Sequence, residues 1–162
     1  MNFCPQCAEP LSDVVLDGEE RRACVIQTCG FVLWNNPTPV VAMIVEIDDG
    51  VVLAHNVAWP EDFYSIITGY LEAGEAPEEC ARRETEEELG LIPLSSSLVG
   101  VYSFPEQNQV IIAYHVRAEG EVKLNHELDA FKIVPKEKLK GWKKATGLAI
   151  IDWLEAEGFS QH

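Results

Sequence analysis

The most informative part of the chain is residues 69–91, which read GYLEAGEAPEECARRETEEELGL. Pro77 suits the first turn of a helix, and Gly90 suits the position just after the last turn. The residues between them favour a helix, so the sequence predicts one over 77–89. Glutamates crowd this helix and the loop before it. Their positions around the helix axis therefore indicate what the segment can do.

Three glutamates share one face of the predicted helix. Because each residue advances by about 100°, Glu88 lies about 40° to one side of Glu84 and Glu87 about 60° to the other. Such carboxylates repel one another, and their pKa values rise unless a cation lies among them. Hard oxygen ligands suit Mg²⁺ or Mn²⁺. The neighbouring stripe should pack on a sheet; it consists of Ala81, Thr85 and Leu89.

The alternative is a solvent-exposed helix that carries ion pairs and no metal. Glu78 with Arg82, and Glu79 with Arg83, have the four-residue spacing of helical ion pairs. Each pair would contribute only a few tenths of a kcal/mol. Helix composition alone favours this simpler interpretation, because charged helical faces are common and metal sites are not.

The complete spacing favours the metal site. Gly69, Glu75, and the run from Arg83 to Leu91 have the spacing of the Nudix box, G-x5-E-x7-R-E-U-x-E-E-x-G-U, which this segment resembles. The one departure is Thr85, where the pattern prefers a bulky aliphatic residue, and this affects packing only. The resemblance implies a Nudix hydrolase with an α/β fold, an α/β/α sandwich around a mixed β-sheet.

The resemblance also implies a magnesium or manganese site. Glu87 and Glu88 correspond to the metal-ligand pair, and Glu84 to a further ligand or to the base that orients water. Glu127 aligns with a late glutamate that resembles another ligand in the family. Bound divalent ions would neutralise the pyrophosphate, lower the pKa of a water and hold the leaving oxygen.

Four further residues have supporting roles by the same resemblance. Arg83 corresponds to the residue that holds the glutamates in place, and Glu75 to a supporting carboxylate. Gly69, with the carbonyl of Thr68 before it, corresponds to the loop that closes onto the metal.

The rest of the chain after residue 35 supplies strands and a second helix. Two apolar runs, 40–47 and 51–54, flank Asp48-Asp49-Gly50 and predict a β-hairpin. An amphipathic helix is expected near 147–157. Strands on both sides of one central helix predict a mixed sheet between helical layers; the further expected strands are 63–68, 98–104, 110–116 and 130–134.

The N-terminus carries a cysteine pattern typical of a metal site. Cys4, Cys7, Cys24 and Cys29 read C-x2-C-x16-C-x4-C. In a cytosolic chain this favours structural Zn²⁺, with a disulfide, a redox dithiol or a site that has lost its metal as alternatives. We therefore expect a zinc ribbon over 1–34 and a hydrolase domain over 35–162. Cys80, within the helix, is expected to be a packed side chain.

A zinc ribbon before a Nudix domain resembles the NADH pyrophosphatase branch and related proteins that act on FAD and ADP-ribose. This implies cleavage of a nucleoside diphosphate derivative with release of AMP, and a homodimer. The NADH pyrophosphatase hallmark beyond the box is present only as Ser103-Phe104-Pro105, so the resemblance does not name the substrate. Candidates for adenine stacking are the aromatic residues Phe31, Trp34, Tyr64 and Tyr102, although core packing is the more common role of such residues and is favoured for most of them.

Charge and hydropathy narrow the class of partner. The net charge is −15, from 27 acidic and 12 basic residues, and this field would repel long nucleic acid but not a small nucleotide bound with cations. No apolar run approaches a membrane span, and Met1–Pro5 does not resemble a secretory signal, so a cytoplasmic protein is expected.

The rival functional class is a nucleotide sensor or partner-binding module, and RNA-end processing is a further alternative. The intact Glu84, Glu87 and Glu88 favour an enzyme.

Overall fold

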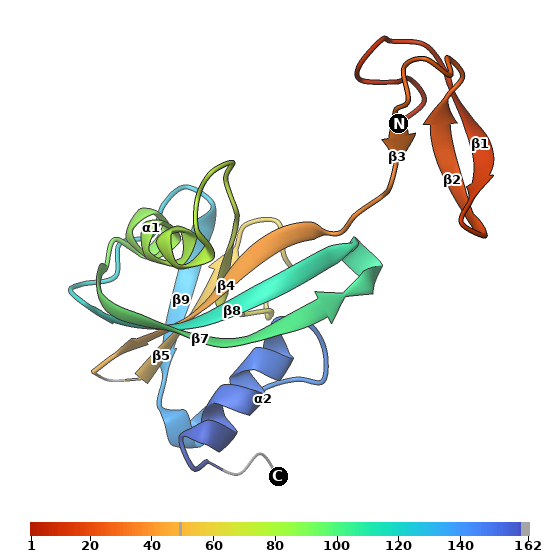
Figure 1. Ribbon diagram of the computed structural model, residues 1–162. Helices are drawn as coiled ribbons and strands as arrows, with labels where there is room; N and C mark the ends of the chain where they lie inside the picture. The colour runs from red at the N-terminus through yellow and green to blue at the C-terminus, as the bar shows by residue number, and fades with distance from the viewer. Residues whose placement is uncertain (49, 160–162) are drawn as a thin grey trace. The chain divides into compact units, whose positions relative to one another are not determined.

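The computed structural model describes residues 1–48 and 50–159 (Figure 1). The chain divides into two compact units, Met1–Asn36 and Pro37–His162. No helix in the described part of the chain is long and apolar enough to cross a membrane.

The first unit is a small antiparallel sheet of β1 (Leu11–Leu16), β2 (Glu19–Cys24) and β3 (Val32–Leu33). Asp17 and Gly18 connect β1 to β2 with φ of 53° and 83°, as a tight two-residue hairpin requires. Among residues 1–36, all of which are described, only Cys4 and Leu11 are buried apolar side chains. A unit this small with so little core needs another source of stability.

The second unit contains the mixed sheet that the sequence predicts. Its strands follow the order β7-β8-β4-β5-β9, and β6 pairs with β4. The pair β4–β8 is parallel and the other pairs are antiparallel. The bounds are β4 Thr38–Ile47, β5 Gly50–Asn56, β6 Ile67–Tyr70, β7 Ile92–Phe104, β8 Gln109–Glu119 and β9 Leu128–Val134.

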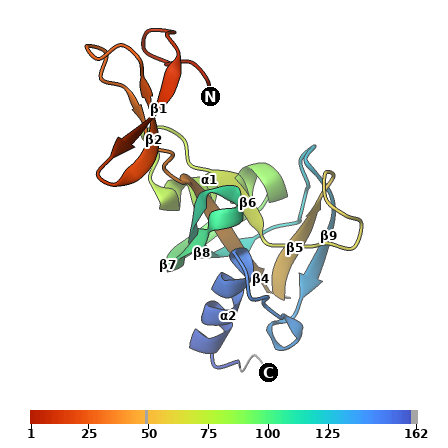
Figure 2. The same cartoon turned by 90° about the vertical axis from the view of Figure 1, so that its right-hand side faces the viewer.

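Strand β4 lies at the centre and is buried on both faces. Val41, Met43 and Val45 pack on the side of α1 (Pro77–Leu89), while Ala42 and Ile44 pack on the side of α2 (Thr146–Ala156). Figure 1 shows the two helices on opposite faces of the sheet, and Figure 2 shows β5 beside β9 at one edge. Burial on both faces explains why β4 is continuously apolar.

Most predicted elements are present, with shifted bounds. Helix α1 spans the predicted residues and ends at Gly90, which has φ 64°. The strand predicted over 63–68 is wrong over its first four residues, because β6 begins only at Ile67. Residues before it form a loop with local turns, and Ser65 makes a single bridge to Ala54. The hairpin of β4 and β5 forms; its turn residue Asp49 lies outside the described residues.

Candidate active site

Arg83 organises the carboxylates of α1. Its guanidinium donates to both oxygens of Glu75, from Nε at 2.8 Å and from Nη2 at 2.9 Å. Its Nη1 donates to Glu84 at 2.8 Å and to Glu87 at 3.1 Å. The two-pronged contact with Arg83 lowers the pKa of Glu75 to about 2. Arg83 therefore ties the loop before α1 to the acidic face of the helix.

Arg83 forms an i,i+4 ion pair with Glu87 on α1, but the two pairs suggested by the sequence, Glu78 with Arg82 and Glu79 with Arg83, are replaced by other contacts. Arg82 donates to the carbonyl of Pro93 at 3.1 Å, and Glu78 accepts a hydrogen bond from Ser96 at 2.6 Å. Glu79 accepts a hydrogen bond from the Ala76 amide at 2.9 Å and closes the first turn. The charged residues of α1 thus bind neighbouring elements, and Arg83 is turned toward the acidic face.

Glu88 is a buried carboxylate among other carboxylates. Its exposed fraction is 8%. Burial first, and then the carboxylates of Glu84, Glu127 and Glu87, raise its pKa to about 8. Within residues 1–48 and 50–159, no group donates a hydrogen bond to this carboxylate. A charged carboxylate in this buried position lowers the free energy of unfolding, and a bound cation would offset that loss.

Backbone hydrogen bonds hold the segment of Glu127 beside the glutamates of α1. The Lys123 amide donates to the Leu89 carbonyl at 2.8 Å, and the Asn125 amide donates to the Glu88 carbonyl at 3.2 Å. These bonds fasten the segment before β9 to the last turn of α1. The Asn125 side-chain oxygen accepts a hydrogen bond from the Glu127 amide at 3.0 Å. The tertiary fold thus brings Glu127 to the glutamates of the helix.

Gly69 gives the Glu84 side chain the space it occupies. A Cβ atom on Gly69 would lie 2.2 Å from the Glu84 carboxyl carbon, which no real side chain tolerates. Strand β6 places this glycine opposite Val41 and places Thr68 opposite Ala42 of β4. The close approach of β6 to α1 therefore requires glycine at position 69.

These residues enclose an acidic cavity of about 670 Å³. Its lining includes every predicted metal-site residue outside the N-terminal unit: Thr68, Gly69, Glu84, Glu87, Glu88 and Glu127. Glu75 and Arg83 do not line the cavity but fix its carboxylates. The four predicted glutamates line this one cavity, and Glu88 is buried without a donor. Carboxylate oxygens are the ligands that Mg²⁺ or Mn²⁺ prefers, so the residues present fit such an ion. Their individual roles remain predictions.

A second cavity, of about 540 Å³, is one that the sequence did not indicate. Its aromatic lining consists of Trp59, Phe63, Phe104 and Trp142. These residues belong to three segments that are far apart in the chain, and they follow no sequence pattern.

None of the four aromatic residues suggested for adenine stacking lines this cavity. Tyr64 packs on His55, with ring centroids 5.5 Å apart, and the Tyr102 hydroxyl donates to Asp152 at 2.8 Å. Phe31 and Trp34 belong to the first unit.

The four N-terminal cysteines converge in the first unit. Their sulfur atoms all lie within 4.8 Å of one another. The Sγ atoms of Cys4 and Cys29 are 3.7 Å apart, and those of Cys7 and Cys24 are 3.4 Å apart. A tetrahedral zinc–thiolate site has S–S edges of about 3.8 Å. The cluster therefore fits zinc, and all four cysteines are free thiols, as is Cys80.

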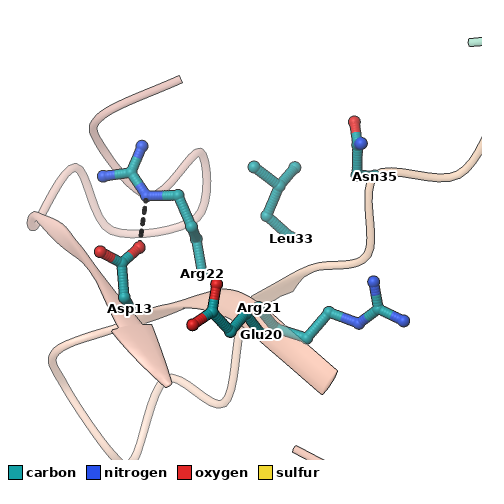
Figure 3. A pocket seen from close by; sticks show the side chains of 6 residues that line it. All are labelled: Asp13, Glu20, Arg21, Arg22, Leu33 and Asn35. Atoms are coloured by element: carbon teal, nitrogen blue, oxygen red, sulfur yellow. Dashed lines mark ion pairs between the residues drawn. The ribbon is translucent and has the colours of Figure 1, made fainter. Parts of the chain in front are cut away.

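A further cavity, of about 330 Å³, lies on the sheet of the first unit (Figure 3). Arg22 lies 3.6 Å from Asp13 and donates to the Leu11 carbonyl at 3.2 Å. Arg21 and Glu20 also line it, so positive and negative side chains balance. Arg22 thus cross-links the ribbon, and the cavity does not have the excess positive charge that a phosphate chain would require.

Residues 36–154 match the NUDIX domain family. A stretch of 121 residues is 27% identical to the NAD-capped RNA hydrolase NudC of Pseudomonas entomophila, covering 74% of this chain and 42% of that protein. A stretch of 76 residues is 34% identical to the protein of the same name from Mycobacterium tuberculosis, covering 47% of this chain and 24% of the relative. The chain thus spans less than half the length of these relatives.

Solved structures show the same fold. A Nudix hydrolase from Nitrosomonas europaea superposes with a TM-score of 0.78 at 22% identity, covering 98% of this chain and 94% of its own. An ADP-ribose pyrophosphatase from Streptococcus suis has a TM-score of 0.62 at 19% identity. The match covers 78% of this chain and 96% of that protein. With the matched residues extending over most of the sequence and the Nudix box on β6 and α1, this chain belongs to the Nudix hydrolase family.

Proposed function

We propose that the chain hydrolyses the pyrophosphate bond of a nucleoside diphosphate linked to another moiety, such as FAD, ADP-ribose or NADH, and releases AMP. The observation that carries this proposal is Glu88, a buried carboxylate without a donor, at the acidic cavity. A nucleotide sensor has no need to keep the complete set of Glu84, Glu87 and Glu88, so the intact set favours an enzyme.

Each part of the site has a role in this reaction. Glu84, Glu87, Glu88 and Glu127 would hold Mg²⁺ or Mn²⁺, which neutralises pyrophosphate charge and lowers the pKa of water when bound. Arg83 keeps the carboxylates of Glu84 and Glu87 in place, and Glu75 keeps Arg83 oriented. Glu84 would also accept the proton of the attacking water or orient that water.

The test is a hydrolysis panel. Purified protein is incubated with FAD, ADP-ribose, NADH and a diadenosine polyphosphate, with Mg²⁺ or with a chelator, and products are separated by chromatography. We expect AMP from at least one compound, only when the divalent ion is present. Binding of these nucleotides without cleavage of any of them would support the sensor instead.

NAD-capped RNA is a second candidate substrate, since the two relatives named above are NAD-capped RNA hydrolases. The net charge of −15 argues against a long RNA, because RNA phosphates would be repelled. A short NAD-capped transcript belongs in the same panel. At equal concentration, we expect the best-cleaved small nucleotide of the panel to be cleaved faster than the capped RNA.

We further propose that the protein is a homodimer. Edge strand β7 contains no charged residue, although the whole chain carries −15. It exposes Ile92, Leu94, Leu98 and Val101. A long uncharged apolar edge is normally covered. Light scattering should give twice the chain mass of 18.0 kDa, and a constant single-chain mass across concentrations would contradict the dimer.

We also propose that residues 1–34 form a zinc ribbon and residues 35–162 form the hydrolase domain. The converging cysteine thiols of the first unit support the zinc assignment. Thiolate zinc sites suit a reducing compartment, which agrees with the expected cytoplasmic location.

A further inference from the structure

We infer that His55 is a positioning residue of the metal site, because it holds an irregularity of β9 that brings Glu127 to the acidic cavity. The inference rests on the metal site of the proposed function, since it concerns how one predicted ligand is held. His55 lies one residue before the end of β5 and is not among the described residues that line the acidic cavity. It acts through Asp129, two residues after Glu127.

Strand β9 has one residue more than β5 at this point. His55 pairs with Ala130, but the next residue of β5, Asn56, pairs with Leu128, so Asp129 is an extra residue between the two pairs. Such an extra residue is a β-bulge. Bulges bend a strand and change the direction of nearby side chains, and they are frequent beside active sites.

The bulge decides how the chain enters β9 from Glu127. Side chains of a strand alternate between its faces, so one extra residue reverses the faces on one side of it. With the bulge, Leu128 packs in the core on the side of α1. Without it, Leu128 would pair opposite Val57 and turn away from that core. In the observed register the Glu127 carbonyl accepts a hydrogen bond from the Val57 amide at 3.1 Å, and this fixes the backbone of the ligand.

His55 holds the extra residue through a buried contact. Its exposed fraction is 6%, and its Nδ1 lies 2.5 Å from Oδ1 of Asp129. Its Nε2 lies 3.1 Å from the carbonyl oxygen of Pro60, in the loop between β5 and β6. Both partners are acceptors, so a protonated ring satisfies both contacts by donating from each nitrogen. The contact with Asp129 accordingly raises the pKa of His55.

One ring therefore connects two segments beside Glu127. The first is the bulge itself. The second is the loop after β5, whose Trp59 lines a narrow space of about 40 Å³ together with Glu88 and Glu127. Metal ligands depend on supports of this kind, and loss of an outer partner typically lowers metal affinity about 10- to 100-fold.

A second histidine–carboxylate pair in the same sheet provides the control. Nε2 of His115, on β8, lies 2.7 Å from Oε2 of Glu46, on β4. Neither residue is among the described residues that line the acidic cavity or the narrow space. A purely structural role for His55 predicts that replacing either histidine has the same consequences. A positioning role predicts that only His55 affects metal binding.

The test measures Mn²⁺ binding to the full chain without any nucleotide, by electron paramagnetic resonance of the free ion. The binding that Glu88→Gln abolishes is the binding compared. His55→Gln should weaken it about tenfold. His115→Gln should leave it within about twofold, although each variant is expected to unfold at a lower temperature. In hydrolysis, His55→Gln should need more Mg²⁺ for half-maximal turnover, and saturating Mg²⁺ should restore kcat.

Asp129 offers a pair of variants with a smaller effect on folding, because its side chain is 52% exposed. Asp129→Ala and Asp129→Asn both remove the negative charge, but only asparagine keeps an oxygen that accepts a hydrogen bond from His55. Asp129→Ala should weaken Mn²⁺ binding about tenfold, and Asp129→Asn should restore most of that loss. Equal weakening in the two variants would overturn the inference, since charge alone would then account for the effect.

Three other results would overturn it. They are unchanged Mn²⁺ affinity in His55→Gln, an equal loss in His115→Gln, and Mn²⁺ binding that does not depend on Glu88. The two proposals fail separately. Cleavage of a nucleotide with the same metal requirement in wild type and His55→Gln would exclude the role of His55 alone. Weakened Mn²⁺ binding in His55→Gln, without cleavage of any nucleotide by wild type, would exclude the hydrolase function alone.

Discussion

Replacing Glu88 with glutamine is expected to reduce turnover by about a thousandfold or more, which corresponds to losing about 4 kcal/mol of transition-state stabilisation. Glutamine keeps the size of the side chain but lacks the charge that a hard cation requires. In the metal-free protein the same change should raise the free energy of unfolding, because Glu88 is buried and faces Glu84, Glu87 and Glu127. Steady-state kinetics and urea denaturation with a chelator measure the two effects.

The matched control is Glu86→Gln, the same substitution on the same helix. Glu86 is exposed and lines neither the acidic nor the aromatic cavity. We prefer it to Glu79, whose carboxylate accepts the Ala76 amide. Turnover of Glu86→Gln should stay within about twofold of wild type, since solvated surface changes have small effects. Equal turnover in wild type and Glu88→Gln would mean that the metal site lies elsewhere.

Removal of zinc is expected to unfold the unit Met1–Asn36 and to leave the second unit folded. This unit buries only Cys4 and Leu11 among its apolar side chains, so bound metal would supply most of its folding free energy. Metal analysis of freshly prepared, reduced protein should give about one zinc per chain. After chelation, or in Cys24→Ser, amide signals of residues 1–36 should lose their dispersion in NMR spectra.

Cys80→Ser is the control for this experiment. Cys80 is buried on α1 and belongs to the second unit, so its substitution should leave the zinc content unchanged. Reduced wild-type protein that contains no zinc, yet shows dispersed signals from residues 1–36, would contradict the zinc assignment.

The sequence by itself was sufficient for features that depend on local spacing. The bounds of α1 follow from Pro77 and Gly90, whose backbone preferences act within one helical turn. The shared face of Glu84, Glu87 and Glu88 follows from helical geometry. The mixed sheet follows from the order of apolar runs, although the strand expected over 63–68 begins only at Ile67.

The tertiary structure decided the features that need distant residues. Arg83 could have paired with Glu79 one turn away, yet the loop before α1 offers it both oxygens of Glu75. Glu127 reaches the acidic cavity because backbone hydrogen bonds fasten its segment to the end of α1. The side chain of Glu88 is buried because β6 and the segment that carries Glu127 pack beside α1 and exclude solvent from it.

The aromatic cavity belongs entirely to the tertiary structure. Trp59, Phe104 and Trp142 are separated by about forty residues each and share no periodicity. A sequence pattern reports neighbours along one helix or strand, because side-chain direction repeats with the period of that element. Residues on different loops become neighbours only when packing of the whole sheet and both helices fixes where those loops lie.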